Sequence, residues 1–145
     1  MVDKNYIKER LIKCLMEEEN KKIVGGVLIK CTNTNRILLL FRNDKIPKWA
    51  LMSGTIDKGE TVLDGLKREI YEELFIRATG IKFKPMGIEQ ITDKNMEFHY
   101  FEGFCDVEFK PILDDENLNY LWCNLSNLPS PLYNGLIDKI KNILK

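Results

Sequence analysis

Residues 54–76 read GTIDKGETVLDGLKREIYEELFI and contain an unusual density of acidic residues. Glu69, Glu72 and Glu73 are spaced at i, i+3 and i+4, which on a helix places them within about 100° of one face. Like charges this close repel one another unless a cation lies among them. Grouped carboxylate oxygens are the ligands that hard divalent ions such as Mg²⁺ prefer. The spacing therefore predicts a helix with a divalent metal along one edge.

The same segment carries the apolar face of a helix. Its large aliphatic residues recur at i, i+3, i+7 and i+11, a helical period, at Leu63, Leu66, Ile70 and Leu74. Thr61 is a residue type that caps helix N-termini, and Asp64 follows it three positions later, as in a capping box. We therefore expect a helix that begins after Thr61, packs one edge on the core and presents the acids along the adjacent edge.

The whole segment resembles the signature of the Nudix hydrolases, G-x5-E-x7-R-E-U-x-E-E-x-G-U, in which U is a bulky apolar residue. The residues in register are Gly54, Glu60, Arg68, Glu69, Ile70, Glu72, Glu73 and Ile76. In the family, Glu60 and Arg68 match a structural pair that orients the acids and offsets their repulsion, and Gly54 matches a structural position. A water-exposed acidic helix face is the alternative interpretation, and the match at Glu60 and Arg68 argues against it.

Phe75 is the one departure from the signature, because the family has glycine there. Glycine lets a chain leave a helix with a positive φ angle, a conformation that costs other residues about 1 kcal/mol or more. We therefore predict that Phe75 keeps a negative φ angle and that its ring packs on neighbouring apolar side chains.

The resemblance implies an α/β fold, the Nudix-type α/β/α sandwich with a mixed β-sheet. It also implies a site in which Glu69, Glu72 and Glu73 bind Mg²⁺, or Mn²⁺ as an alternative, together with the carbonyl oxygen of Ser53. Glu69 matches the position assigned as general base or metal ligand. Glu69, Glu73 and Arg68 are therefore the candidate catalytic residues of the motif.

A further catalytic acid is expected outside the motif. Many family members take one from the loop before the last strand, in a pattern like E-x5-W. Glu116 stands six residues before Trp122 and is our candidate. The alternatives are that Glu116 is an ordinary loop carboxylate, or that Asp114 or Asp115 has this role.

Substrate contacts carry a weaker signal. Arg42 and Lys48 precede the motif and are candidates for binding phosphates. Trp49, Phe98 and Tyr100 are candidates for stacking on a base. Solvated surface charge is the alternative for the two cations, and core packing is the alternative for the aromatic residues.

Composition excludes several classes of protein. The 145 residues contain 22 Lys+Arg and 22 Asp+Glu, so there is no global basic field and no strong nucleic-acid signal. The cysteines, Cys14, Cys31, Cys105 and Cys123, have no CxxC spacing, which disfavours a zinc site. The start, MVDKNYIKER, lacks the apolar core of a signal peptide, and no apolar run approaches the roughly 18 residues that span a bilayer. We expect a cytoplasmic protein that does not enter membranes.

The order of predicted elements is that of one domain over residues 1–145. An amphipathic helix is expected at about 3–18, which either packs on the domain or pairs with a partner such as a second copy in a homodimer. Strands are expected at 23–31 and 36–42, as a hairpin, and at 49–51, 83–92, 96–109 and 120–123. A C-terminal helix is expected at about 131–144, with Ser130 as its N-cap.

The function implied by the resemblance is Mg²⁺-dependent hydrolysis of a small-molecule nucleotide. The bond cleaved would be the diphosphate linkage of a nucleoside diphosphate joined to another moiety: ADP-ribose, a dinucleoside polyphosphate, a dinucleotide cofactor or a nucleoside triphosphate. The alternatives are a catalytically silent Nudix-fold regulator that binds a nucleotide, and an RNA 5′-cap hydrolase. Silent members typically lose motif acids, and this chain keeps them.

Overall fold

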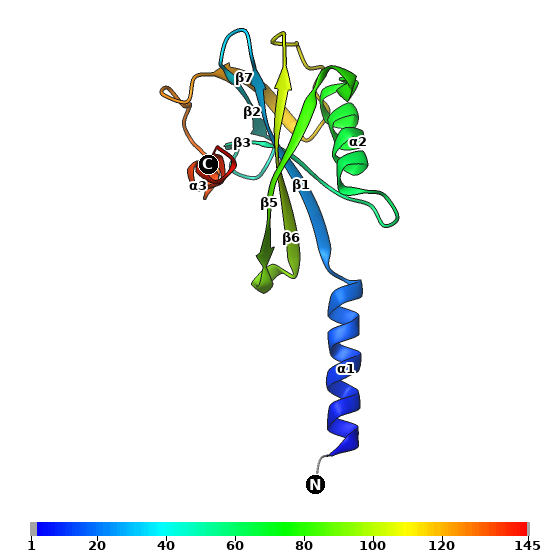
Figure 1. Ribbon diagram of the computed structural model, residues 1–145. Coiled ribbons are helices and arrows are strands. Elements are labelled where there is room, and N and C mark those ends of the chain that lie inside the picture. Colours follow the sequence, from blue (N-terminus) through cyan, green and yellow to red (C-terminus); the bar gives the residue numbers. More distant parts are fainter. Residues whose placement is uncertain (1–2, 145) are drawn as a thin grey trace.

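The computed structural model describes residues 3–144 and consists of a mixed sheet with helices around it (Figure 1). In chain order the helices and strands are α1 (Lys4–Glu19), β1 (Lys22–Cys31), β2 (Ile37–Arg42), β3 (Trp49–Ala50), β4 (Met52–Thr55), α2 (Val62–Leu74), the 3₁₀ helix η1 (Ala78–Gly80), β5 (Lys82–Ile91), the 3₁₀ helix η2 (Thr92–Lys94), β6 (Met96–Cys105), β7 (Asn117–Cys123) and α3 (Leu136–Ile143).

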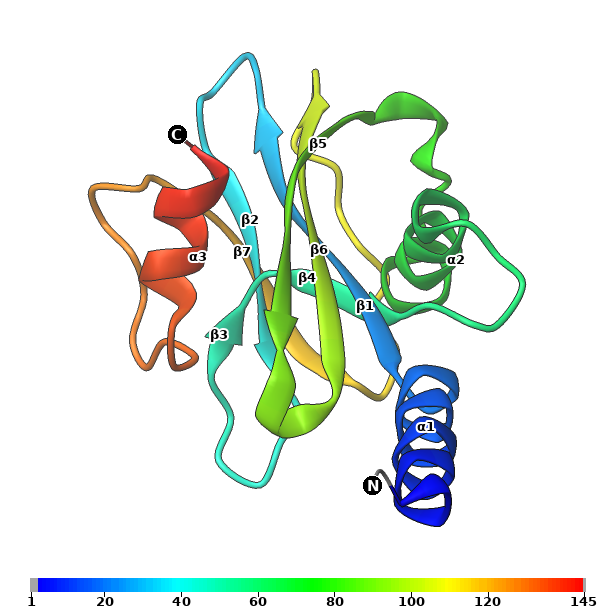
Figure 2. The ribbon, with the colours of Figure 1, turned by 60° about the horizontal axis from the view of Figure 1, so that its bottom comes forward.

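The seven strands form one sheet with the order β3-β2-β1-β6-β5, in which β4 also pairs with β1 and β7 with β2. β1 and β6 run parallel from Lys22 opposite Met96 to Cys31 opposite Cys105, and the other pairs are antiparallel. Figure 2 shows α2 and α3 on opposite sides of this sheet. The predicted α/β sandwich with a mixed sheet is therefore confirmed.

The central strands are apolar on both faces because each face is covered by a helix. In β2, Leu38 and Leu40 lie in the core cluster that contains the apolar face of α2, whereas Ile37 and Leu39 lie in the cluster beneath α3. All of these side chains are buried. A strand covered on both faces needs a continuous apolar run rather than an alternating one, and the sequence ILLLF supplies it.

Gly54 lies on β4, a strand that was not predicted from the sequence. β4 pairs with β1 so that Ser53 is opposite Gly26 and Gly54 is opposite Gly25. Serine and glycine have low strand propensity and β4 is short, so its sequence gives little sign of a strand. The predicted N-cap of the next helix is confirmed, because the Thr61 hydroxyl accepts a 3.1 Å hydrogen bond from the Asp64 backbone N–H.

The C-terminal helix begins later than predicted, and Ser130 is not its N-cap. α3 starts at Leu136, after Gly135, which has a φ angle of 79°. The residues before it pair with β3 instead: the Trp49 N–H donates to the Pro131 carbonyl at 2.9 Å, and the Tyr133 N–H donates to the Trp49 carbonyl at 2.8 Å. These backbone groups are therefore used by the sheet edge and are not free to start a helix.

Both predictions for Phe75, a negative φ angle and a ring packed on neighbouring apolar side chains, are wrong. Its φ angle is 55°, in the left-handed region, and its ring is 58% exposed. The Phe75 N–H still donates to the Tyr71 carbonyl at 2.9 Å, so the helix ends in the turn that glycine makes in the family signature. The ring contacts that of Tyr71, with a centroid separation of 5.4 Å, at the surface rather than in the core.

α1 extends away from the rest of the molecule (Figure 1). Its large apolar side chains are exposed at Tyr6, Ile7, Leu11, Ile12, Leu15 and Met16. The prediction that this helix packs on the domain is therefore wrong, and its pairing with a partner stays a prediction. No helix in the described part of the chain is both long and apolar enough to cross a bilayer.

Candidate active site

Arg68 holds the acids of α2 and of the preceding loop together. Its guanidinium contacts Glu60 at 2.7 Å, Glu69 at 3.1 Å and Glu72 at 3.1 Å. It also donates to the Thr55 carbonyl at 3.0 Å, which ties the helix to β4. The hydrogen bond from Arg68 lowers the pKa of Glu60, so this carboxylate stays ionised and the pair stays intact.

Glu69 projects from α2 across the backbone of β4. Any side chain at Gly54 would meet it, because a Cβ there would lie 2.3 Å from the Glu69 Cγ atom. Burial raises the pKa of Glu69, and the hydrogen bond from Arg68 opposes this rise. The absence of a side chain at Gly54 therefore fixes the position of the Glu69 carboxylate.

Glu73 is the most buried acid of the motif, with only 1% of its surface exposed. Its Oε1 atom accepts from Arg42 Nη1 at 3.1 Å and from Asn117 Nδ2 at 2.9 Å. Its Oε2 atom is buried without a partner among the described residues. Burial raises the pKa of Glu73 to about 8, against the hydrogen bond from Asn117 and the charge of Arg42. The negative charge of Glu69 is close enough to raise the pKa of Glu73 further.

The three motif acids are thus not equivalent. Glu72 is 55% exposed, whereas the side chains of Glu69 and Glu73 are 16% and 1% exposed. The i, i+3, i+4 spacing groups them on one side of α2. Glu73 lies at the edge of this side that is next to the core, and it is therefore buried. A fully solvated acidic face is excluded by this burial.

Glu116 reaches the site from the segment before β7. Its Oε2 atom lies 3.8 Å from Arg42 Nη2, so Arg42 stands between Glu116 and the buried Glu73. Asp114 instead accepts a 3.1 Å hydrogen bond from the Glu116 backbone N–H and shapes the turn. Of these loop acids, Glu116 lines the pocket beside Glu69 and Ser53, and Asp114 and Asp115 do not.

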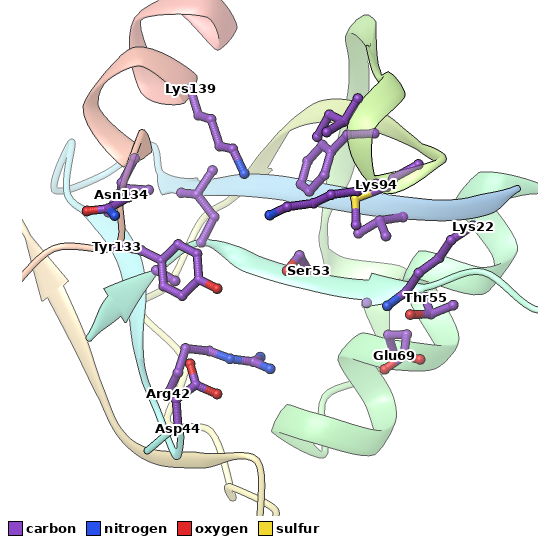
Figure 3. A pocket seen from close by; sticks show the side chains of 18 of the residues that line it. Lys22, Arg42, Asp44, Ser53, Thr55, Glu69, Lys94, Tyr133, Asn134 and Lys139 are labelled. Carbon is purple, nitrogen blue, oxygen red and sulfur yellow. The ribbon is translucent and has the colours of Figure 1, made fainter. Parts of the chain in front are cut away.

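The pocket beside these residues has a volume of about 410 Å³ and runs from α2 to the start of α3 (Figure 3). Ser53, Gly54, Glu69, Arg42 and Glu116 line it. Lys48 and Trp49, which the sequence analysis proposed for substrate contact, are not among its lining residues. The ring of Trp49 packs on Phe41, with a centroid separation of 4.9 Å, and against the core beneath α3.

Several pocket residues were not predicted from sequence. Lys22, Lys94, Tyr133, Asn134 and Lys139 come from four separate segments and carry no recognisable spacing. Asn117, which holds Glu73, also had no signal beyond its position next to Glu116. Only the folded sheet brings these residues together.

The residues present fit a divalent cation by their chemistry. Within residues 3–144, no three His, Cys, Asp or Glu side chains are already arranged as a ligand set, since Arg68 and Arg42 hold the acids. The partnerless Oε2 atom of Glu73, however, is an oxygen donor that costs free energy while it is left unsatisfied. The carboxylate of Glu69 is near enough for its charge to act on Glu73, and neighbouring hard oxygens of this kind suit Mg²⁺.

Comparison with known proteins places the chain in a family. The NUDIX domain model matches residues 21–142. A curated RNA pyrophosphohydrolase from Ruthia magnifica subsp. Calyptogena magnifica is 30% identical over 98 residues, covering 68% of this chain and 51% of that protein. The chain therefore matches about half the length of this relative.

Two solved structures with the same fold have a TM-score of 0.69. One is a NUDIX hydrolase from Nitrosomonas europaea, 22% identical, with 84% of this chain and 69% of that chain covered. The other is the NUDIX domain of Shewanella oneidensis NrtR complexed with ADP ribose, 14% identical, with 83% and 84% covered. At these identities the structures show the fold alone. Because the domain model covers most of the sequence, the chain belongs to the Nudix hydrolase family.

Proposed function

We propose that this protein hydrolyses the diphosphate linkage of a nucleoside diphosphate joined to another moiety, in a reaction that depends on Mg²⁺ or Mn²⁺. The observation that supports this most directly is the buried carboxyl group of Glu73, whose Oε2 atom has no hydrogen-bond partner among the described residues. A fold does not keep an unsatisfied buried carboxylate without cost, and a bound cation would remove that cost.

The residues that would hold the metal are Glu69, Glu72 and Glu73, with the carbonyl oxygen of Ser53. When bound, a divalent ion neutralises phosphate oxygens and acidifies a water molecule. The protein must hold these oxygens in position while the ion and the substrate bind and leave.

Arg68 and Glu60 meet that requirement from outside the cluster. The Arg68 guanidinium contacts Glu69 and Glu72 at 3.1 Å each and is itself fixed by Glu60 at 2.7 Å. This contact offsets the repulsion between the acids and sets the orientation of the Glu69 carboxylate. Arg68 thus acts as a positioning residue.

Arg42 and Glu116 line the pocket next to the buried Glu73 and are suited to act on substrate. Arg42 is partly exposed and presents a guanidinium fork, which binds phosphate oxygens. Glu116 is 59% exposed and lies 3.8 Å from Arg42, so its carboxylate remains available to accept a proton from water. Glu69 is the second candidate for the general base.

Small nucleotides are favoured over RNA as substrates. One structural relative was solved with ADP ribose bound, and the pocket volume of about 410 Å³ suits a small molecule. The curated relative is an RNA pyrophosphohydrolase, which makes RNA 5′ ends the second candidate. The chain carries equal numbers of acidic and basic residues, so the sequence offers no excess positive charge for a polynucleotide.

The test is a turnover screen of the purified protein with ADP-ribose, diadenosine tetraphosphate, a dinucleotide cofactor, nucleoside triphosphates and 5′-triphosphate RNA. Each is incubated with Mg²⁺, and the products are separated by chromatography. We expect cleavage of at least one small nucleotide, its loss in excess chelator and its return with Mg²⁺ or Mn²⁺. Undiminished turnover in chelator would exclude the metal role, and binding of a nucleotide without cleavage would favour the silent regulator.

A further inference from the structure

Three lysines line the pocket. Lys22 stands at the start of β1, Lys94 ends η2, and Lys139 is on α3. In Figure 3, Lys22 lies at the Glu69 end of the pocket, while Lys94 and Lys139 extend toward each other further along it. The pocket therefore has an acidic end, where the diphosphate would be cleaved, and a basic end beyond it.

No direct ion pair holds the lysines of this pocket. Among the side chains that the structure describes, none of these three lysines forms an ion pair with a carboxylate. Two of the acids that line the pocket, Glu69 and Glu116, contact Arg68 and Arg42 instead, and Asp44 lines it as well. The ammonium groups are therefore available to a ligand.

Lys139 is held in a partly apolar setting. Its Nζ atom lies 4.4 Å from the centroid of the Phe98 ring, a cation–π contact that aims the ammonium group into the pocket. Burial lowers the pKa of Lys139, and the nearby charge of Lys94 lowers it further, while Glu89 acts in the opposite direction. Glu89 itself accepts a hydrogen bond from the Tyr100 hydroxyl.

Two ammonium groups that face one pocket repel each other, and the low dielectric of the pocket strengthens that repulsion. An anion placed between them reverses the sign of the interaction. Phosphate suits this role, because lysine binds it as a compact charge with several donors. In a nucleotide substrate, the anionic groups available beyond the cleaved linkage are further phosphates.

We propose that Lys94 and Lys139 bind a phosphate group that lies beyond the cleaved diphosphate, so that the protein prefers nucleotides with three or more linked phosphates over nucleoside diphosphate sugars. This inference rests on the proposed hydrolytic function and names the substrate class within it. Lys22 lies at the Glu69 end of the pocket (Figure 3) and contributes positive charge beside the linkage that would be cleaved.

The first test compares kcat/KM for diadenosine tetraphosphate with kcat/KM for ADP-ribose, both with Mg²⁺. The variants are Lys94→Ala, Lys139→Met, which keeps an unbranched apolar stem over Phe98, and Lys141→Ala. Lys141 is an exposed residue of the same helix that does not line the pocket, so it is the matched control. We expect the ratio of the two values to fall by about tenfold in each pocket variant, as for the loss of one charge-assisted contact, and to stay constant in the control.

The second test measures binding without turnover. Titration calorimetry with inorganic tripolyphosphate, in chelator, should give an affinity that is about tenfold weaker for Lys139→Met than for the wild type. Thermal melting of each variant checks that it is folded. Tripolyphosphate binding can be measured whether or not the protein is a hydrolase. This measurement therefore tests the anion site separately from the proposed hydrolytic function.

Three outcomes would overturn the inference while leaving the hydrolytic function intact. One is an equal loss for both substrates in the pocket variants. Another is an unchanged substrate ratio and unchanged tripolyphosphate binding. The third is a selective loss for ADP-ribose, which would place a group other than a further phosphate between the lysines. Absence of any turnover with intact tripolyphosphate binding would instead remove the hydrolytic function and leave the anion site.

Discussion

Gly54 and Glu69 are in contact in a way that leaves no room for a side chain at position 54. A Cβ atom there would lie 2.3 Å from the Glu69 Cγ atom, well inside van der Waals distance. β4 holds Gly54 opposite Gly25 of β1, so the strand cannot move aside without breaking the sheet. The position of the Glu69 carboxylate therefore depends on the identity of residue 54.

The Gly54→Ala variant should lose both stability and activity. We expect the free energy of unfolding to fall by about 1–3 kcal/mol, because the added methyl group overpacks the site. Displacement of the Glu69 carboxylate should lower kcat by on the order of 10²-fold. Chemical denaturation and steady-state kinetics measure the two effects. Gly80→Ala is the control, because nothing lies within 4 Å of a Cβ at that position; equal behaviour of the two variants would contradict the contact.

Glu73→Gln should change the pH dependence of stability in the metal-free protein. The pKa of Glu73 rises from its ordinary value of 4.5 to about 8 on folding. Between these values the unfolded chain has released the proton and the folded chain keeps it, so this group lowers stability progressively as pH rises. Glutamine does not ionise, and the variant escapes this loss.

We therefore expect the stability of Glu73→Gln relative to the wild type to increase from pH 5 to pH 8, by on the order of a few kcal/mol. Denaturant unfolding in chelator at each pH measures it. Glu72→Gln, which changes a carboxylate that is 55% exposed, is the control and should show no such trend. Turnover with Mg²⁺ should fall by orders of magnitude in Glu73→Gln, since charge at the metal is lost. A difference in stability that stays constant with pH would mean that the buried carboxyl is ionised throughout.

Leu11→Ala and Leu66→Ala should change the free energy of unfolding by very different amounts. Leu11 on α1 is 59% exposed, whereas Leu66 on α2 is fully buried in the core. We expect a loss of about 2–5 kcal/mol in the free energy of unfolding for Leu66→Ala and a change within about 0.5 kcal/mol for Leu11→Ala. Both are read from denaturant unfolding at low protein concentration. A loss above about 1 kcal/mol for Leu11→Ala would mean that α1 packs on the domain in solution.

The parts of the structure that the sequence predicted are those with a local physical cause. The cap of α2 depends on Thr61 and Asp64, and the grouping of the motif acids depends on helical spacing, both within one segment. The pocket lysines depend on distant pairings: Lys94 approaches Lys22 only because β1 runs parallel to β6. The residue pattern within either segment does not predict such a long-range strand pairing.

Predictions from the sequence were wrong or incomplete where contacts between distant segments outweighed a local preference. Pro131 is a good first residue for a helix, but its carbonyl pairs with Trp49 at the sheet edge. The burial of Glu73 likewise could not be read from spacing, because it depends on Asn117 and Arg42 from other strands. At Phe75, the chain adopts the left-handed conformation in which helices commonly end, against the intrinsic preference of phenylalanine for a negative φ angle.

The Phe75→Gly variant tests how the cost of the left-handed conformation compares with the stabilisation that the phenylalanine side chain provides. The left-handed conformation costs Phe75 about 1–2 kcal/mol, which glycine would recover. Glycine also adds about 0.5–1 kcal/mol of chain entropy to the unfolded state, and the contact with Tyr71 is lost. Since the ring is exposed, little buried area is at stake. We therefore expect the free energy of unfolding to change by less than about 1 kcal/mol.

The comparison that isolates backbone strain is Phe75→Val against Phe75→Asn. Both remove the ring, but valine is β-branched and tolerates a φ angle of 55° poorly, whereas asparagine adopts it readily. We expect stability in the order glycine, asparagine, valine, with valine lower than glycine by about 1 kcal/mol or more. Metal-dependent turnover should persist in all three, because Glu69 and Glu73 lie upstream on the helix. Equal stability of the valine and asparagine variants would show that the helix end has moved out of the left-handed region, and a collapse of turnover at unchanged stability would place the ring of Phe75 in the active site.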